Sequence, residues 1–175
     1  MFKTILVATD NSEYSCKAVE LAGDIANKYG AKLILLHVIH PQKVNQELRH
    51  MVDVEYPMDQ GPKLMKPASE YPTNLAESLV KVNAIADDSY QYLKLLAEQI
   101  LRRASKLALK QGIEDAVSKI MDGDPAQEIL ECANRENADL IVVGSRGLGN
   151  LKGLLMGSVS NKVSQHAKCS CVIVK

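Results

Sequence analysis

Two short apolar runs on either side of a helical pattern constrain the fold more than any other feature of the chain. Residues 4–8 (TILVA) and 32–38 (KLILLHV) are mostly apolar and too short for helices, as is typical of strands buried on both faces. Between them, apolar residues recur at helical spacing from Ala18, and Gly30 ends the pattern. A strand–helix–strand unit implies a parallel pair with a right-handed crossover. The first forty residues therefore predict an α/β fold.

The same alternation returns in the second half of the chain. The predicted elements are, in order, a helix at 90–110, a strand at 116–121, a helix at 125–137, a strand at 140–143, a helix carrying Val159 and Val163, and a strand at 171–174. Asp124 followed by Pro125 is a typical N-cap and first helical residue. Five strands alternating with four helices predict a doubly wound five-stranded parallel sheet. We expect one domain over residues 1–175, because no repeat or second domain is evident.

A long insertion interrupts this pattern at about residues 41–74. Five of the six prolines lie between Pro41 and Pro72, and neither a helical nor a strand period is sustained there. A connection of this length is usually a functional flap, an interaction arm or partly disordered, and these alternatives stay open. The stretch 74–77 (NLAE) resembles a capping box, which favours a helix start near Leu75.

Charge and composition argue against several classes of partner. The chain has 175 residues, with 21 Lys and Arg against 21 Asp and Glu, and it shows no basic run, so nucleic acid is not expected as a partner. No apolar stretch approaches the roughly 18 residues of a membrane helix. The apolar run at the start is too short for a signal peptide, so we expect a cytoplasmic protein with four reduced thiols. Cys169 and Cys171 lack the spacing and further ligands of a metal site.

The strand at 140–143 is followed at once by a glycine-rich stretch, 144–158 (GSRGLGNLKGLLMGS), with five glycines. Ligands of doubly wound sheets bind at the carboxyl ends of the strands, where this stretch begins. Glycine lets backbone N–H groups approach an anion, and the following helix adds its positive N-terminal end. Arg146 could add a charge-assisted contact, and Ser158 could cap the helix or bind a phosphate. The stretch therefore predicts a phosphate site.

The spacing of the glycines excludes two common phosphate motifs. A Walker A motif needs Gly-Lys-Ser/Thr, but Gly153 is followed by two leucines. A dinucleotide fingerprint needs a third glycine where Lys152 stands, and it follows the first strand of a sheet. The stretch instead reads Gly144-x2-Gly147-x9-Gly157-Ser158.

This spacing after an Asp-Leu-Ile-Val-Val strand resembles the ATP-binding signature of the universal stress protein family. The resemblance extends over nearly the whole chain, through ILVATDNS, LLHV, MDGDPAQEIL, ADLIVVGSRG and LMGSVSNKV. It implies a Rossmann-like, adenine nucleotide alpha hydrolase-like fold with strand order 3-2-1-4-5. It also implies ATP across the ends of the first and fourth strands, and a homodimer formed through the last strand.

The resemblance also implies a set of nucleotide-binding residues. The adenine and ribose contacts fall on Ala8, Thr9, Asp10, Val38, Met121 and Gly123. The phosphate contacts fall on Gly144, Arg146, Gly147, Gly157, Ser158, Val159 and Ser160. Mg²⁺ or Mn²⁺ would be held mainly by the phosphates and not by a protein metal site.

Two positions depart from the family pattern. Asn11 stands where glycine is frequent, but asparagine also adopts the left-handed conformation. The last strand begins with Ser170 and Cys171 where proline is usual, which puts the dimer edge in question.

Other interpretations of single residues stay open. The glycine stretch could be only a flexible loop, Asp10 only a helix cap and Met121 only a core residue. His37, inside an apolar strand, favours a buried, hydrogen-bonded histidine over a catalyst.

For function, the leading hypothesis is an ATP-binding regulatory protein of the stress response. It is not an enzyme, since no catalytic base is identifiable. The alternatives are a slow ATPase or nucleotidyl-transfer enzyme using the same pocket, and a structural adaptor that binds no nucleotide.

Overall fold

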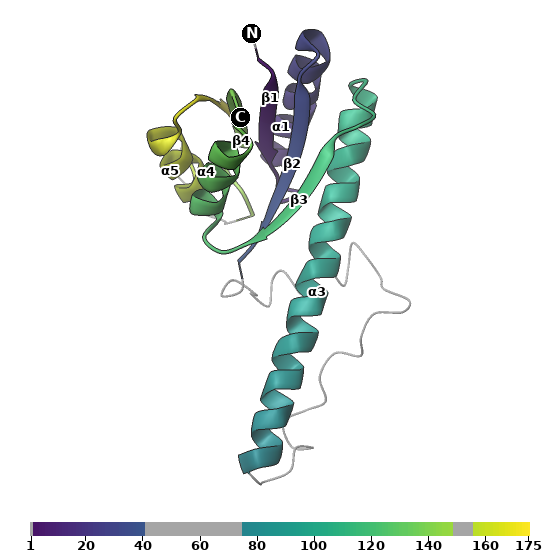
Figure 1. Ribbon diagram of the computed structural model, residues 1–175, viewed down its shortest axis with the longest axis vertical. Coiled ribbons are helices and arrows are strands. Elements are labelled where there is room, and N and C mark those ends of the chain that lie inside the picture. Colours follow the sequence, from purple (N-terminus) through teal and green to yellow (C-terminus); the bar gives the residue numbers. More distant parts are fainter. Residues whose placement is uncertain (1, 41–74, 149–155) are drawn as a thin grey trace. The chain divides into compact units, whose positions relative to one another are not determined.

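Among the described residues, five parallel strands form one sheet in the order β3-β2-β1-β4-β5 (Figure 1). This computed structural model describes residues 2–40, 75–148 and 156–175, with the side chains of α3 described from Tyr90 onward. The elements are β1 Thr4–Ala8, α1 Glu13–Tyr29, β2 Lys32–Ile39, α3 Leu75–Lys110, β3 Val117–Asp122, α4 Pro125–Arg135, β4 Leu140–Gly144, α5 Ser158–His166 and β5 Ser170–Val174. The predicted fold class and strand order are confirmed.

The chain divides into two compact units. Residues 1–40 and 97–175 form the unit that contains the sheet, and residues 41–96 form the other. The insertion predicted at 41–74 lies outside the described residues, as does Asn74 of the expected capping box. The expectation of one domain over 1–175 therefore stays a prediction.

The helix boundaries refine the sequence prediction. Helix α1 begins at Glu13, before the apolar period that starts at Ala18, and the Ser12 side chain caps it by accepting the Ser15 N–H (3.4 Å). Gly30 ends this helix in the left-handed conformation with φ 62°, as predicted. Helix α3 is continuous from Leu75, so the helix predicted at 90–110 is its second half.

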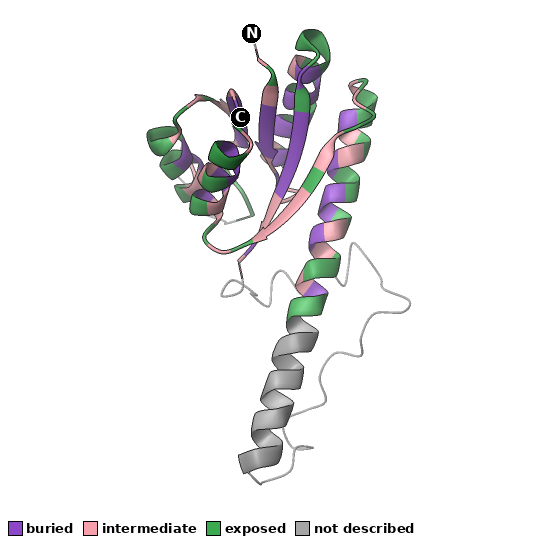
Figure 2. Cartoon of the chain, in the orientation of Figure 1, coloured by how far each residue is buried: buried purple, intermediate pink, exposed green. Residues whose placement is uncertain are grey.

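Alternate residues of the central strands build two separate hydrophobic layers. One face of the sheet packs on α1 and residues 97–110 of α3, and the other packs on α4 and α5. On β1, Ile5 and Val7 belong to the first layer and Leu6 to the second, and all three are fully buried. Figure 2 shows β1 and β2 buried over most of their length, whereas β3 at the edge is partly exposed. Each fully buried Leu or Ile contributes about 1.5–3 kcal/mol relative to exposure.

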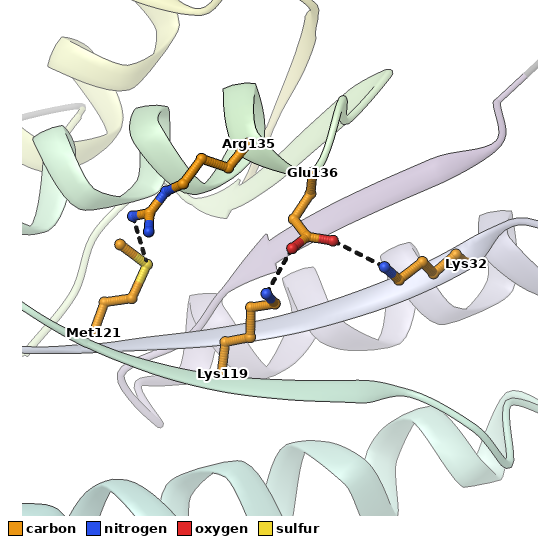
Figure 3. Close-up of polar contacts among 5 residues, drawn as sticks. All are labelled: Lys32, Lys119, Met121, Arg135 and Glu136. Carbon is orange, nitrogen blue, oxygen red and sulfur yellow. Dashed lines mark hydrogen bonds and ion pairs between the residues drawn. The ribbon is translucent and has the colours of Figure 1, made fainter.

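A carboxylate at the end of α4 fastens this helix to two strands. Glu136, the C-cap residue, accepts hydrogen bonds from Lys119 (2.6 Å) on β3 and Lys32 (2.8 Å) on β2, as Figure 3 shows. The neighbouring Arg135 reaches the Met121 sulfur at 3.7 Å. These hydrogen bonds, from Lys119 first and then Lys32, lower the pKa of Glu136 from 4.5 to about 2. The ionised carboxylate therefore favours the folded state.

We expect Glu136→Gln to destabilise the fold at pH 7 and to lose this effect in acid. Since the folded pKa lies below the unfolded one, the stabilisation is fully present above about pH 4.5 and disappears as the pH falls towards 2. Urea unfolding of both proteins at pH 7, 4.5, 3 and 2 measures the difference. Glu131→Gln on the same helix is the control, because its carboxylate is half exposed and lies 3.9 Å from Arg135. Equal free energies of unfolding for wild type and Glu136→Gln at pH 7 would contradict the expectation.

Candidate functional site

The segment after β1 is hydrogen-bonded to the segment after β4. One oxygen of the Asp10 carboxylate accepts the Ser12 N–H (3.0 Å), and the other accepts the Leu148 N–H (3.0 Å). The Ser12 hydroxyl donates to the Arg146 carbonyl (3.4 Å). Ser12, and not Asp10, is thus the cap of α1, and the Asp10 carboxylate holds the start of the glycine stretch in place.

Two glycines of the motif lie against this contact between segments, Gly144 against backbone and Gly147 against a side chain. A Cβ added at Gly144 would lie 2.8 Å from the Ser15 nitrogen and 3.0 Å from the Tyr14 Cβ. A Cβ added at Gly147 would collide with the Asp10 carboxylate. Neither glycine has a positive φ, so close approach and not backbone conformation explains them. The sequence predicts that the glycine backbone closely approaches an anion. At Gly144 and Gly147 the close neighbour is instead the chain's own segment from Asp10 to Ser15, at the start of α1.

Gly157 differs from both. It is the N-cap of α5 with φ −75° and ψ 159°, a conformation open to other residues. The nearest atom to an added Cβ would be the Ser145 carbonyl oxygen at 3.4 Å, which is ordinary contact. Its own N–H donates to that carbonyl (2.7 Å). Neither packing nor backbone geometry within the described residues requires glycine here.

The first turn of α5 presents backbone N–H groups without a side-chain cap. The first hydrogen bond within the helix runs from the Asn161 N–H to the Gly157 carbonyl (2.9 Å). The N–H groups of Ser158, Val159 and Ser160 precede it and have no acceptor among the described residues. Ser158, expected as a possible cap, is instead the first residue of the helix. A helix start of this kind attracts anions.

A hydrogen bond between Ser160 and Ser145 connects the first turn of α5 to the residue that follows β4. The buried Ser160 hydroxyl donates to the Ser145 carbonyl (2.9 Å) and lies 3.0 Å from the Gly157 carbonyl. The Ser145 N–H donates to the carbonyl of Val174 on β5 (2.6 Å). The Ser160 side chain is therefore engaged within the protein, whereas its backbone N–H has no acceptor among the described residues.

Arg146 is an exposed cation held by an aromatic ring. Its guanidinium donates to the Tyr14 hydroxyl (2.6 Å) and lies 4.8 Å from the ring centre. No carboxylate in the described part of the chain forms an ion pair with it. Tyr14 was not among the site residues expected from the sequence.

The residues expected to contact adenine and ribose line the ends of β1, β2 and β3. Val38 is the register partner of Met121, and both pack with Ala8 against the layer under α4 and α5. Gly123 donates its N–H to the Ile39 carbonyl (3.0 Å) and has φ 145°, which favours glycine. The structure thus brings all thirteen expected residues to the carboxyl edge of one sheet, in two groups on either side of Asp10. Their contacts with a nucleotide stay a prediction.

Thr9, one of the residues expected to contact adenine and ribose, is held by His37 and Ser15. The His37 Nδ1 is 2.8 Å from the Thr9 carbonyl, and burial lowers the pKa of His37 below 6.5. The neutral imidazole therefore donates Nδ1–H to this carbonyl, so His37 is hydrogen-bonded as expected but only half-buried. The Thr9 hydroxyl lies 3.1 Å from that of Ser15, and Asn11 has φ 66° as anticipated.

Several site types find no support in the residues described. No three His, Cys, Asp or Glu side chains in these residues gather as they would around a metal ion. All four cysteines are free thiols. No helix within the described ranges is long and apolar enough to cross a membrane.

Comparisons with known proteins agree on one family. A family model described as "Universal stress protein family" matches residues 1–175. The chain is 32% identical to universal stress protein YxiE of Bacillus subtilis over 176 residues, covering all of both. It resembles the solved structure of hypothetical protein MJ0577 with a TM-score of 0.71 at 25% identity, covering 100% of this chain and 96% of that one. A universal stress protein solved in complex with cAMP gives a TM-score of 0.63 at 29% identity, with 99% and 97% covered.

We expect Gly147→Ala to destabilise the protein through Asp10. The added methyl group displaces the carboxylate and its hydrogen bond to Leu148, at a cost of about 1–3 kcal/mol. In an Asp10→Ala background the same substitution should cost much less, because the colliding group is absent. Gly157→Ala is the matched control, and it should change stability little, since its added Cβ meets only ordinary contacts. Urea unfolding of the single and double variants measures this, and equal losses in both backgrounds would show that Asp10 is not the cause.

Proposed function

This chain belongs to the universal stress protein family, and from this premise we propose that it is an ATP-binding regulatory protein of the stress response. The observation that carries the proposal is the start of α5. Three backbone N–H groups there lack acceptors among the described residues, beside a glycine that the packing of those residues does not require. The guanidinium of Arg146, which is hydrogen-bonded to Tyr14, follows the end of β4 at the same edge. These groups suit the chemistry of a phosphate chain.

The family member solved with cAMP supports an adenine nucleotide as the ligand class. We assign the adenine and ribose to the edge formed by Ala8, Val38 and Met121, with the backbone of Thr9, Asp10 and Gly123 beside it. We assign the phosphates to Gly144, Arg146 and Gly147 and to the N–H groups from Gly157 to Ser160. The bound nucleotide's own phosphates would hold Mg²⁺ or Mn²⁺.

The proposed role is regulatory and not catalytic. Hydrolysis needs a group that accepts a proton from water near the terminal phosphate. Asp10, the carboxylate between the two halves of the site, has each oxygen engaged by a backbone N–H. Arg146 can stabilise negative charge but accepts no proton. We propose a cytoplasmic protein that binds no nucleic acid and responds to bound ATP. Steady multiple turnover of ATP with Mg²⁺ would overturn this part and favour an ATPase.

We expect Gly157→Val to weaken ATP binding more than tenfold, which is about 1.4 kcal/mol or more. Its methyl groups would fill the space that a phosphate oxygen needs at the start of α5. The extended backbone at this position accepts valine, so the variant should fold. Arg146→Ala should weaken ATP binding but change adenosine binding much less. Isothermal titration with ATP and adenosine measures both variants, with thermal unfolding as the control for folding. A folded Gly157→Val that binds ATP like wild type would refute the phosphate site.

We further propose that β5 pairs with a second copy of the chain. Among the described residues, strand β5 joins the sheet only through β4, and its side chains from Cys171 to Val174 are half-buried. The Val174 carbonyl points towards β4, where it accepts the Ser145 N–H. Because successive residues of a strand point to opposite sides, the N–H and carbonyl of Ile173 point to the free edge. An unpaired edge of this kind is a template for a partner strand.

We expect Ile173→Pro to convert the dimer into monomers. Proline removes the N–H of residue 173, which faces the free edge. The hydrogen bonds between β5 and β4 keep all their donors. Sedimentation velocity measures the change in mass, and thermal unfolding checks that the monomer stays folded. Equal sedimentation of a folded Ile173→Pro and the wild type would argue against this interface.

A further inference from the structure

Tyr14, in the first turn of α1, holds the guanidinium of Arg146 in two ways. The Tyr14 hydroxyl accepts a hydrogen bond from Arg146 Nη2 (2.6 Å), and the Arg146 Cζ lies 4.8 Å from the centre of the ring. A hydrogen bond restrains one end of the guanidinium, and the ring attracts its charge. The two residues are 132 positions apart in the sequence, so their contact depends on the assembled sheet.

Tyr14 is itself fixed by the packing of α1 on the end of β4. An added Cβ at Gly144 would lie only 2.8 Å from the Tyr14 carbonyl carbon, which shows how closely the two segments approach. The Ser12 hydroxyl also donates to the Arg146 carbonyl (3.4 Å). The first turn of α1 thus restrains Arg146 at its backbone and at its charged end.

Within the described residues no carboxylate forms an ion pair with Arg146, and the pKa of the nearby Glu13 is lowered mainly by Lys17 and least by Arg146. A second cation, Lys17, lies 5.4 Å from the centre of the same ring, but it forms an ion pair with Glu13 at 2.7 Å. Of the two cations on Tyr14, Arg146 is therefore the one without an ion-pair partner in the described part of the chain.

We propose that Tyr14 is a positioning residue, which orders Arg146 for the phosphates and so sets the preference of the site for ATP over adenosine. The inference rests on the proposed ATP site. An exposed arginine loses side-chain freedom when it binds a phosphate, and this loss weakens binding. A guanidinium already held on a ring loses less. Adenosine has no phosphate, so its affinity is independent of this ordering.

The test compares Tyr14→Leu and Tyr14→Phe with wild type by isothermal titration with ATP and with adenosine. Tyr14→Leu removes the ring and the hydroxyl, and should weaken ATP binding about three- to tenfold. Tyr14→Phe keeps the ring, and should weaken it only about two- to threefold. Adenosine affinity should not change in either variant. Tyr29→Leu, at the far end of the same helix, is the matched control and should bind both ligands like wild type.

A double-mutant cycle with Arg146→Ala separates positioning from a general structural effect. Once the guanidinium is gone, Tyr14→Leu should cause no further loss of ATP affinity. A loss of the same size with and without Arg146, an equal loss for adenosine, or unchanged ATP binding would each overturn the inference. If Tyr14→Leu does not fold, Tyr14→Phe in the same cycle decides by the same criteria. If the wild type itself binds no ATP, the proposed function fails; if it binds ATP and the Tyr14 variants match it, only this inference fails.

Discussion

The direct parallel pairing of β1 with β4 is the constraint on which the rest of the structure depends. It brings Asp10 and Leu148, which are 138 residues apart, within one hydrogen bond of each other. The pairing is held by fully buried Leu6 and Val7 on β1 and by Ile141 on β4, so it draws on both hydrophobic layers. Loop residues at the sheet edge can be ordered because these two strands beneath them cannot shift independently.

The sequence predicts the strands well because each buried strand is a continuous apolar run. It predicts a helix start where capping residues mark it, as Asp124 and Pro125 do for α4, whereas apolar spacing alone does not locate the first residue. Helix α1 begins with Glu13, Tyr14 and Ser15, which carry no apolar period, so its pattern emerges only at Ala18. Gly30, by contrast, is predicted correctly because a left-handed C-cap has a strong residue preference.

For the candidate site, the sequence predicts where the glycines lie but not what each one approaches. Gly144 lies against Tyr14, and Gly147 lies against Asp10. These neighbours are far away in the sequence and come together only because the start of α1 packs beside the end of β4. Gly157 faces no close neighbour within the described residues. Tyr14 could not be predicted as a partner of Arg146, because a long-range contact between side chains has no spacing signature.

The backbone of Ser145 forms hydrogen bonds both with the start of α5 and with the end of β5. Its carbonyl accepts hydrogen bonds from Gly157 and Ser160, and its N–H holds the carbonyl of Val174 on the edge strand. One peptide segment therefore belongs both to the proposed phosphate cradle and to the strand proposed to pair with a second copy. Linkage makes any effect between the two events reciprocal: the factor by which nucleotide changes self-association equals the factor by which self-association changes nucleotide affinity. The apparent nucleotide-binding constant measured in a titration then depends on the protein concentration.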